Sequence, residues 1–287
     1  MSNVLSELVE RLALERIEEN LFRGQSRDMK TRAVFGGQVL AQALSAATQT
    51  VPGERSVHSL HAYFLRAGDV KTPIVYQVDR IRDGASFTTR RVVAVQAGQA
   101  IFNLAASFQR AEPGFEHHEP MPEAPTPERC MSEREHLESF GERTPKAMLE
   151  RVPLRGFELR TVEPVDDLWA PTPMAAQRKV WIRALGTLPE RPALHTQLLL
   201  YASDFMFLTT SLLPHGVAWL SPGMQISSLD HVMWFHHPAR VDEWLLYVME
   251  SPSAQAARGL VRGRIYTQAG LLVASSAQEG LIRPPKA

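Results

Sequence analysis

Asp204 is the residue of this 287-residue chain that points most directly to chemistry. It interrupts an apolar run, with Tyr201 and Ala202 before it and residues 205–207 after it. A carboxyl group in such surroundings lies at a cavity or against apolar groups. In both cases its pKa is perturbed, as is common for residues that transfer protons. The alternative is structural: Asp204 caps a break in its helix or pairs with an arginine.

Polar residues also interrupt the apolar segment 224–235, at Ser227, Ser228, Asp230 and His231. Strict alternation along a strand would place Ser228 and Asp230 on one face and His231 on the other. Asp230 and His231 then point apart and cannot form a relay, so His231 is expected to be a core histidine. No histidines in the chain have a convincing zinc spacing.

Gln278 closes the last apolar strand of the chain. A side-chain amide donates and accepts hydrogen bonds at once, which suits it to holding a water molecule. The structural alternative is a hydrogen bond across the sheet.

The sequence contains two similar halves. Each has an apolar helical run, then alternating strands and a Gln-Ala-Gly turn, at 96–98 and at 268–270. When the halves are aligned, Ser45 falls against Asp204. One copy of a duplicated unit can keep the structure while the other acquires the chemistry, so this difference points to a site in the second half.

The local patterns place the elements around these residues. Apolar positions at helical spacing predict a helix over 36–49, and a second long helix is predicted over 189–213. The N-terminal residues 1–19 have the pattern of an amphipathic helix. Segments rich in β-branched and aromatic residues predict strands at 59–66, 74–82, 86–96, 99–109, 225–235, 244–250, 257–267 and 271–281.

A helix that is apolar on most faces must be covered on most faces, which predicts a sheet wrapped around the helix of each half. This is the hotdog fold. The chain is therefore predicted to be an α+β double hotdog, with the two sheets paired edge to edge. Residues 1–110 are expected to form the first hotdog, residues 111–172 a proline-rich connector, and residues 173–287 the second hotdog, with the candidate site.

The composition excludes several classes of function. Lys and Arg together number 31, as do Asp and Glu, so no general attraction to nucleic acid or an anionic membrane is expected. The single cysteine, Cys130, allows no intrachain disulfide or thiolate metal site. The apolar run 198–213 is too short to span a bilayer. Without a secretory or transit signal, the expected location is the cytoplasm.

Motifs of other enzyme classes are missing from the sequence. There is no G-x-S-x-G, P-loop, H-E-x-x-H or strand-associated G-x-G-x-x-G. This argues against a serine hydrolase, an NTPase, a zinc protease and a dinucleotide-dependent enzyme.

Four separated motifs resemble the TesB-type acyl-CoA thioesterase II family, in the family's order. They are VFGGQV at 34–39, HSLHAYFLR at 58–66, DGASF at 83–87 and LDHVMWFH at 229–236. The resemblance runs essentially end to end, and only the connector departs from it. It implies a double-hotdog enzyme that hydrolyses acyl-CoA to free acid and CoA, with no metal or redox cofactor, and assembly into a homo-oligomer.

Members of that family hold the attacking water with an Asp, a Thr and a Gln of the second hotdog. Carried over, these residues are Asp204, Ser228 and Gln278. A shift of one position would make Ser227 the match instead of Ser228. Serine keeps the hydroxyl of threonine but loses the methyl group that restricts χ1, so a looser orientation and a lower rate are expected.

Thioester hydrolysis suits these residues. A thiol of pKa ~8.5 leaves as thiolate without a general acid. Asp204 is hypothesised to act as general base or to orient the water, with Ser228 and Gln278 as its partners on the water. Backbone N–H groups at a helix N-terminus are hypothesised as oxyanion donors, with Gly36 and Gly37 or the corresponding turn of the second half as candidates.

Two alternative functions stay open at this stage. A hotdog-fold hydratase would use Asp230 and His231 to move a proton and water across a double bond. A non-catalytic acyl-CoA binding protein would keep the fold without turnover, and the serine at position 228 is the one feature that favours it.

Overall fold

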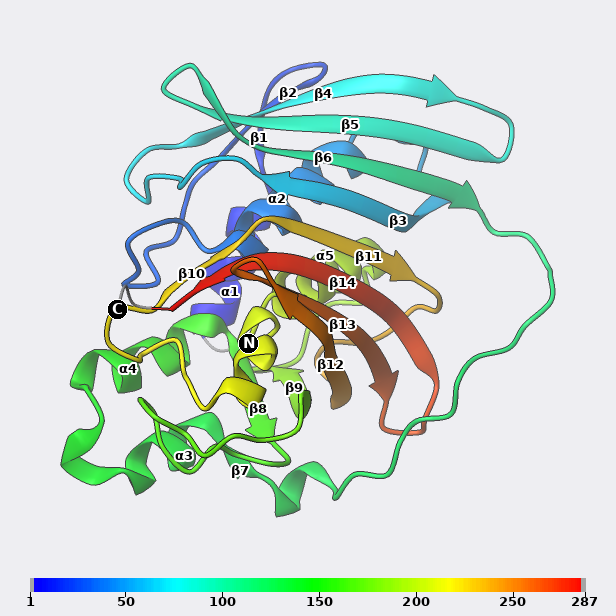
Figure 1. Ribbon diagram of the computed structural model, residues 1–287. Coiled ribbons are helices and arrows are strands. Elements are labelled where there is room, and N and C mark those ends of the chain that lie inside the picture. The colour runs from blue at the N-terminus through cyan, green and yellow to red at the C-terminus, as the bar shows by residue number, and fades with distance from the viewer. Residues whose placement is uncertain (1–2, 285–287) are drawn as a thin grey trace.

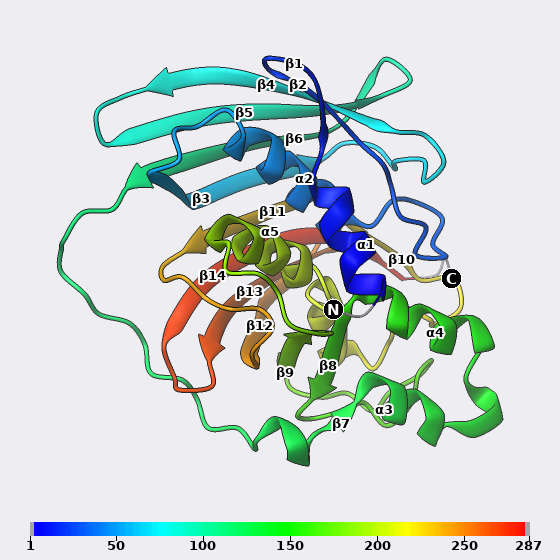
Figure 2. The same ribbon diagram turned by 180° about the vertical axis from the view of Figure 1, so that it is seen from behind.

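A computed structural model describes residues 3–284, so Met1, Ser2 and residues 285–287 lie outside the described part of the chain. Within that part, fourteen strands form one continuous antiparallel sheet. The sheet curves around two helices that lie side by side at its centre (Figures 1 and 2).

The first unit wraps its sheet around helix α2 (Gly36–Thr48). Helix α1 (Asn3–Leu12) packs beside α2. The strands are β1 (Glu15–Glu18), β2 (Leu21–Gly24), β3 (Arg55–Phe64), β4 (Ile74–Asp83), β5 (Phe87–Gln96) and β6 (Gln99–Arg110). Their order in the sheet is β1-β2-β4-β5-β6-β3, so the strand that follows the helix pairs with the last strand.

The second unit repeats this plan around helix α5 (Pro192–Ser203). Its strands are β7 (Met131–Ser132), β8 (Phe157–Thr161), β9 (Gln177–Ala184), β10 (Gln225–Ser228), β11 (Asp230–Phe235), β12 (Leu245–Gln255), β13 (Arg258–Thr267) and β14 (Leu272–Arg283). Their order is β11-β14-β13-β12-β9-β8-β7, and β10 also pairs with β14. The two units share one topology, as the double hotdog predicted from the sequence requires.

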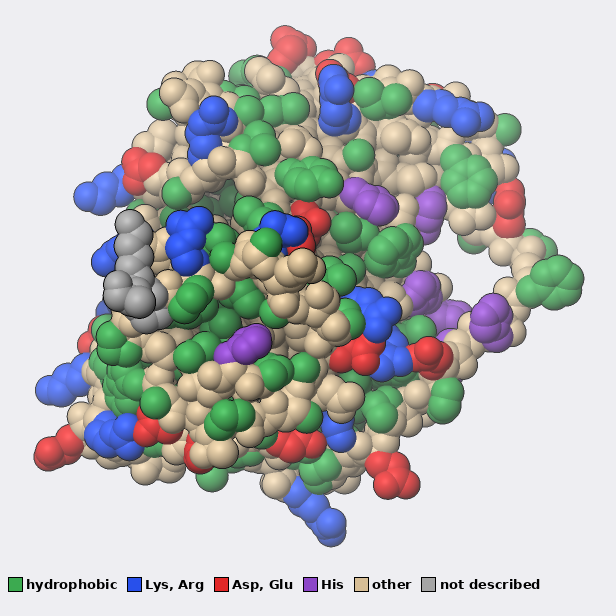
Figure 3. All heavy atoms as spheres, viewed as in Figure 1, with side chains coloured by type: hydrophobic (Ala, Val, Ile, Leu, Met, Phe, Trp, Pro, Cys, Tyr) green, Lys and Arg blue, Asp and Glu red, His purple; other side chains and the backbone are tan. Residues whose placement is uncertain are grey.

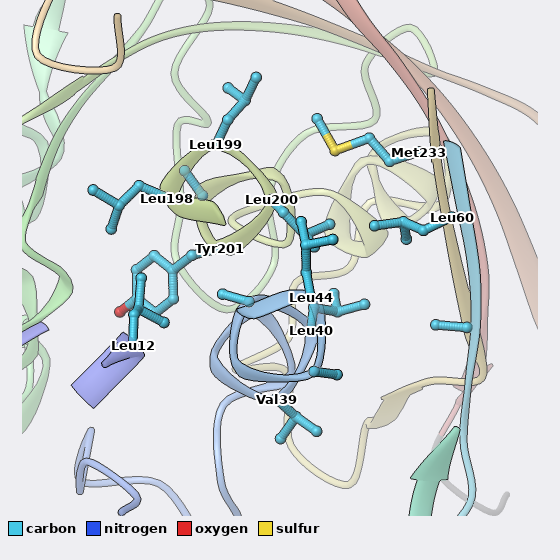
Figure 4. Packing of buried hydrophobic residues seen from close by; sticks show 14 of the residues in the cluster. Leu12, Val39, Leu40, Leu44, Leu60, Leu198, Leu199, Leu200, Tyr201 and Met233 are labelled. Carbon is cyan, nitrogen blue, oxygen red and sulfur yellow. The ribbon is translucent and has the colours of Figure 1, made fainter. Parts of the chain in front are cut away.

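Strands β3 and β11 join the two sheets edge to edge, with Leu60 opposite Met233. Beneath this seam, Leu40 and Leu44 of α2 and Leu200 of α5 pack toward the same two strands (Figure 4). All five side chains are at most 1% exposed. Full burial of each contributes about 2 kcal/mol of transfer free energy, so the seam between the units is part of the core.

Helices α2 and α5 approach closely where α2 begins. A Cβ atom on Gly37 would lie 2.3 Å from the carbonyl oxygen of Tyr201 and 2.5 Å from the ring of Phe35. Both distances are far inside van der Waals contact. Only glycine therefore allows α2 to start against the last turn of α5.

The predicted second long helix, over 189–213, is wrong in its length. Helix α5 ends at Ser203, and Asp204 is its C-cap residue. Met206 then adopts a left-handed conformation, with φ of 59°, before the 3-10 helix η4 (Leu208–His215). The carboxylate stands at a helix end, where it can face another element.

The alignment of the two halves does not give structurally equivalent positions at this point. The C-cap residue of α2 is Gln49, whereas Ser45 lies within the helix and donates a hydrogen bond to the carbonyl of Leu12 at 2.6 Å. Ser45 is therefore a core residue of the first unit and not a counterpart of the C-cap Asp204.

The segment 111–172 contains more regular structure than the expected connector. Helices α3 (Glu133–Ser139) and α4 (Lys146–Arg151) lie here, and α3 begins with a capping box between Ser132 and Glu135. Strand β8 pairs with β9 and extends the second sheet. At the N-terminus, α1 ends at Leu12 and the residues after it form β1, so the predicted helix over 1–19 is too long.

The Gly37 contact predicts a specific loss of stability. Gly37→Ala should lower the free energy of unfolding by about 1–3 kcal/mol, because the added methyl group forces α2 and α5 apart. Urea denaturation checks this. Gly53→Ala is the matched control, since its Cβ would meet nothing within 4 Å. Equal midpoints for the two variants would show that the helices can separate at little cost.

Candidate active site

The carboxylate of Asp204 reaches across the seam to the first unit. Its Oδ2 accepts a hydrogen bond from the backbone N–H of Gly37 at 2.9 Å. Phe35 precedes α2 and offers no side-chain cap, so Asp204 supplies the acceptor that an N-cap side chain normally provides. A Cβ atom on Gly36 would lie 2.8 Å from the same Oδ2, so this glycine also makes room for the carboxylate.

Burial and hydrogen bonding have opposite effects on the pKa of Asp204. Burial raises the pKa of Asp204 to about 7, although the N–H of Gly37 and the amide of Gln278 both act to lower it. The N-terminus of α2 also favours a negative charge. Among the described residues, Asp204 forms no ion pair with an arginine or lysine. The group is therefore close to half ionised at neutral pH and can accept a proton there.

Gln278 and Ser228 meet beside this carboxylate. Gln278, on β14, is 1% exposed, and its Nε2 donates to the Oγ of Ser228 at 2.5 Å. Gln278 also forms the side-chain hydrogen bond that lowers the pKa of Asp204. The three residues carried over from the family resemblance therefore lie together, although they come from three separate elements.

A β-bulge brings Ser228 into this group. Ser228 pairs with Gly280, and Val232 pairs with Ala277. Residues 229–231 therefore lie opposite residues 278–279 of β14, so the β10–β11 segment has one residue more than its partner strand. The extra residue turns the chain between β10 and β11, and bulges of this kind are common beside active sites. Ser228 is thus the serine that contacts Gln278, whereas Ser227 is exposed.

His231 joins the same group, contrary to the expected alternation. Its Nδ1 lies 2.9 Å from the Oε1 of Gln278, and its Nε2 lies 2.9 Å from the Oγ of Ser203. Burial lowers the pKa of His231 to about 4, so the ring is neutral near pH 7. Sequence reasoning missed this contact because the bulge between β10 and β11 depends on pairing with β14, which the order of polar and apolar residues around Leu229 does not reveal.

Asp230 and His231 do not act as a pair. The Oδ1 of Asp230 accepts from the backbone N–H of Glu279 at 2.6 Å, whereas His231 bonds Gln278 and Ser203. The arrangement that a hydratase would use is therefore not formed by these two residues.

A cavity of about 360 Å³ opens beside the group, at the seam. The first unit provides most of its wall, including Gly36, Val39 and Phe64, and the second unit provides the segment 227–229. Of the three candidate residues, Ser228 lines the cavity, whereas Asp204 and Gln278 lie next to the lining residues Gly36 and Ser228. Both apolar side chains and polar groups line this cavity.

On the face of the molecule in Figure 3, acidic and basic side chains are interspersed and neither sign forms one large patch. Among the described residues, no helix is long and apolar enough to cross a membrane.

Comparisons with known proteins agree along the whole chain. The family model described as Acyl-CoA thioesterase matches residues 161–281, and the one described as Acyl-CoA thioesterase N-terminal domain matches residues 25–109. Acyl-CoA thioesterase 2 of Haemophilus influenzae is 41% identical over 99% of each chain. Acyl-coenzyme A thioesterase 8 of Homo sapiens is 42% identical over 95% of this chain and 87% of its own.

The solved structures give the same result. The crystal structure of an acyl-CoA thioesterase II, TesB2, from Mycobacterium marinum is 42% identical, with a TM-score of 0.80, covering 97% of this chain and 99% of its own. Fold and site thus place the chain among the hotdog-fold thioesterases. It belongs to the TesB-type acyl-CoA thioesterase II family and is a thioester hydrolase, which confirms the identification made from the sequence motifs.

The raised pKa of Asp204 predicts how stability depends on pH. The unfolded chain loses this proton near pH 4, whereas the folded chain keeps it up to about pH 7. The folded state therefore binds more protons in this window, and the wild type should lose on the order of 2–3 kcal/mol of unfolding free energy between pH 4.5 and 8 relative to Asp204→Asn. Urea denaturation at both pH values measures this difference.

The matched control should show almost no change in this window. The backbone N–H of Lys71 and the hydroxyl of Thr72 lower the pKa of Asp69, so its contribution to stability is lost only at pH values below the window, and the difference between the wild type and Asp69→Asn should stay nearly constant between the two pH values. A stability difference between the wild type and Asp204→Asn that does not change with pH would show that Asp204 has an ordinary pKa.

Proposed function

We propose that this thioesterase hydrolyses acyl-CoA to free fatty acid and CoA with a water molecule held by Asp204, Ser228 and Gln278. The observation that carries the proposal is the position of Gln278. Its amide donates to Ser228 and also hydrogen bonds with the carboxylate of Asp204, so it ties the hydroxyl and the base into one group beside the cavity.

Ser228 and Asp204 act on the water directly, and Gln278 orients both of them. Ser228 Oγ already accepts from Gln278, which leaves its own proton free to donate to the water oxygen. Asp204, when ionised, accepts a proton from the water as the water oxygen attacks the thioester carbonyl carbon. The carbon–sulfur bond then breaks, and CoA leaves as a thiolate that needs no general acid.

The N-terminus of α2 supports the negative charge that develops on the thioester oxygen. The N–H of Gly37 is already bonded to Asp204. Gly36 lines the cavity, so its backbone is the candidate oxyanion donor, together with the field of the helix. The sequence hypothesis named Gly36 and Gly37 as candidate oxyanion donors. We assign this role to Gly36, because the N–H of Gly37 is already bonded to Asp204.

The wider biology stays at the level of prediction. Acyl-CoA is the proposed substrate because the chain belongs to the acyl-CoA thioesterase family. A homo-oligomer, a role in fatty acid metabolism and a cytoplasmic location are predictions that rest on the sequence and the family resemblance.

Release of free CoA thiol from short-chain to long-chain acyl-CoA esters tests the proposal. Asp204→Asn should lower kcat by ~100-fold or more with KM little changed, because proton acceptance is lost. Ser228→Ala should lower kcat by about 10-fold, in line with the loss of one hydrogen bond to the water. Ser228→Thr is the matched control: it keeps the hydroxyl and should retain turnover at or above the wild-type level.

Two outcomes would contradict the proposal. Full turnover by Asp204→Asn would show that Asp204 is not the general base. No turnover by the wild type on any ester, with acyl-CoA still bound, would leave the non-catalytic binding protein.

The pH dependence of kcat/KM is a separate test. Turnover should rise with pH and level off above about pH 7, because Asp204 must be ionised to accept the proton. The residual activity of Gln278→Ala should show a midpoint at higher pH, because the variant loses a hydrogen bond that favours the carboxylate. A midpoint near pH 4 for the wild type would exclude Asp204 as the group that titrates.

A further inference from the structure

Among the described residues, His231 is a titratable side chain that contacts the proposed water-holding group without being part of it. The side chain is fully buried, and its hydrogen bonds go to Gln278 and Ser203. Its two ring nitrogens bond Gln278 on one side and Ser203 on the other, both at 2.9 Å. Its direct link to the water-holding group is the bond to Gln278, and its second link is to Ser203, the residue before Asp204.

The amide of Gln278 has two possible orientations, and only one of them suits the site. With Nε2 directed at Ser228 and Asp204, the amide donates to a hydroxyl oxygen and to a carboxylate. With the amide reversed, Oε1 would face the carboxylate, and two acceptors would repel each other. The group that bonds the far end of the amide helps to set the choice.

That group is Nδ1 of His231. A neutral imidazole carries one proton, so Nδ1 is either a donor or an acceptor. As a donor it bonds Oε1 of Gln278 and keeps Nε2 of the amide turned to Ser228. As an acceptor it would attract the NH₂ end of the amide and favour the reversed orientation.

The surroundings of Ser203 allow the donor form. Its hydroxyl has one proton and two acceptors within reach, the carbonyl of Leu200 at 2.8 Å and Nε2 of His231 at 2.9 Å, and a proton given to Leu200 would require the ring proton to be on Nε2. The orientation of Gln278, whose Oε1 faces Nδ1, favours the other arrangement. When the hydroxyl proton points to Nε2, the ring proton must be on Nδ1. The carbonyl of Ser203 accepts from the hydroxyl of Tyr247 at 3.0 Å, which holds this residue in place at the end of α5.

We propose that His231 is a positioning residue: as the Nδ1–H tautomer it fixes the amide of Gln278 so that Nε2 faces Ser228 and Asp204. The chain of bonds runs from Ser203 through His231 and Gln278 to the water-holding hydroxyl. The proposal rests on the function proposed above, because it assigns His231 a role in that same site.

A pair of substitutions separates hydrogen bonding from packing. Asn places Nδ2 at the same number of bonds from the backbone as Nδ1 of histidine, so His231→Asn keeps a donor for Gln278. His231→Leu fills the space of the imidazole ring better than His231→Asn does, but it has no hydrogen-bond donor for Gln278. We expect His231→Leu to lower kcat by ~10- to 100-fold with KM changed less than about 3-fold, and His231→Asn to restore most of that loss. If Asn is as impaired as Leu, or if neither is impaired, the proposal is wrong.

A double-mutant cycle shows whether His231 acts through Gln278. On a Gln278→Ala background, His231→Leu should cause no further loss of kcat. Multiplicative losses would assign His231 an independent role and overturn the proposal. If Gln278→Ala alone leaves turnover intact, the proposed function fails instead, so the two failures are distinguishable.

The tautomer can be measured without any activity assay. In the folded protein labelled with ¹⁵N-histidine, the signal lost in His231→Asn identifies this ring among the ten histidines. Its nitrogen shifts at pH 7 should show the proton on Nδ1. A proton on Nε2 would overturn the proposal, and this result does not depend on how well the leucine variant folds.

Discussion

The hydrogen bond from the N–H of Gly37 to Asp204 is the contact on which the rest of this structure depends. It closes the uncapped start of α2 with a side chain from the other unit, so it is part of the packing between the units. In this contact the carboxylate of Asp204 is removed from water and accepts one hydrogen bond from the backbone. Burial wins this balance, and the pKa of Asp204 rises to about 7. One interaction therefore provides both the structural joint and a group that exchanges protons at neutral pH.

Duplication explains why the site lies at a seam. The two units have the same strand order and meet through β3 and β11, so the helix of one ends where the helix of the other begins. The first unit contributes a helix N-terminus and most of the cavity wall, whereas the second contributes the three candidate residues Asp204, Ser228 and Gln278 of the proposed site. Neither unit alone contains the whole site. Because both units belong to one chain, the two different halves of the site are always present in equal numbers.

The sequence predicted the fold well because its signals are local. Alternating segments and Gln-Ala-Gly turns mark the strands, and the apolar helical runs require a covering sheet. The end of α5 at Ser203 could not be predicted, because apolar residues continue through Leu213 into a 3-10 helix and no proline occurs between Ser203 and Pro214. The bulge at Leu229 left no sequence signal either, since it arises from pairing with β14. For that reason Asp204 was found from its neighbours, whereas the contact of His231 was missed.

The serine at position 228 shows how the network replaces a constraint of side-chain stereochemistry. Threonine restricts its own χ1 through its methyl group, and serine does not. Here the Oγ of Ser228 is held by Nε2 of Gln278 at 2.5 Å, within a backbone already fixed by the bulge. Gln278 is in turn held by a buried histidine. The direction of the hydroxyl thus depends on residues around Ser228 more than on Ser228 itself. The looser orientation expected from the sequence applies to a serine without a hydrogen-bond partner, whereas the Oγ of Ser228 is bonded to Gln278.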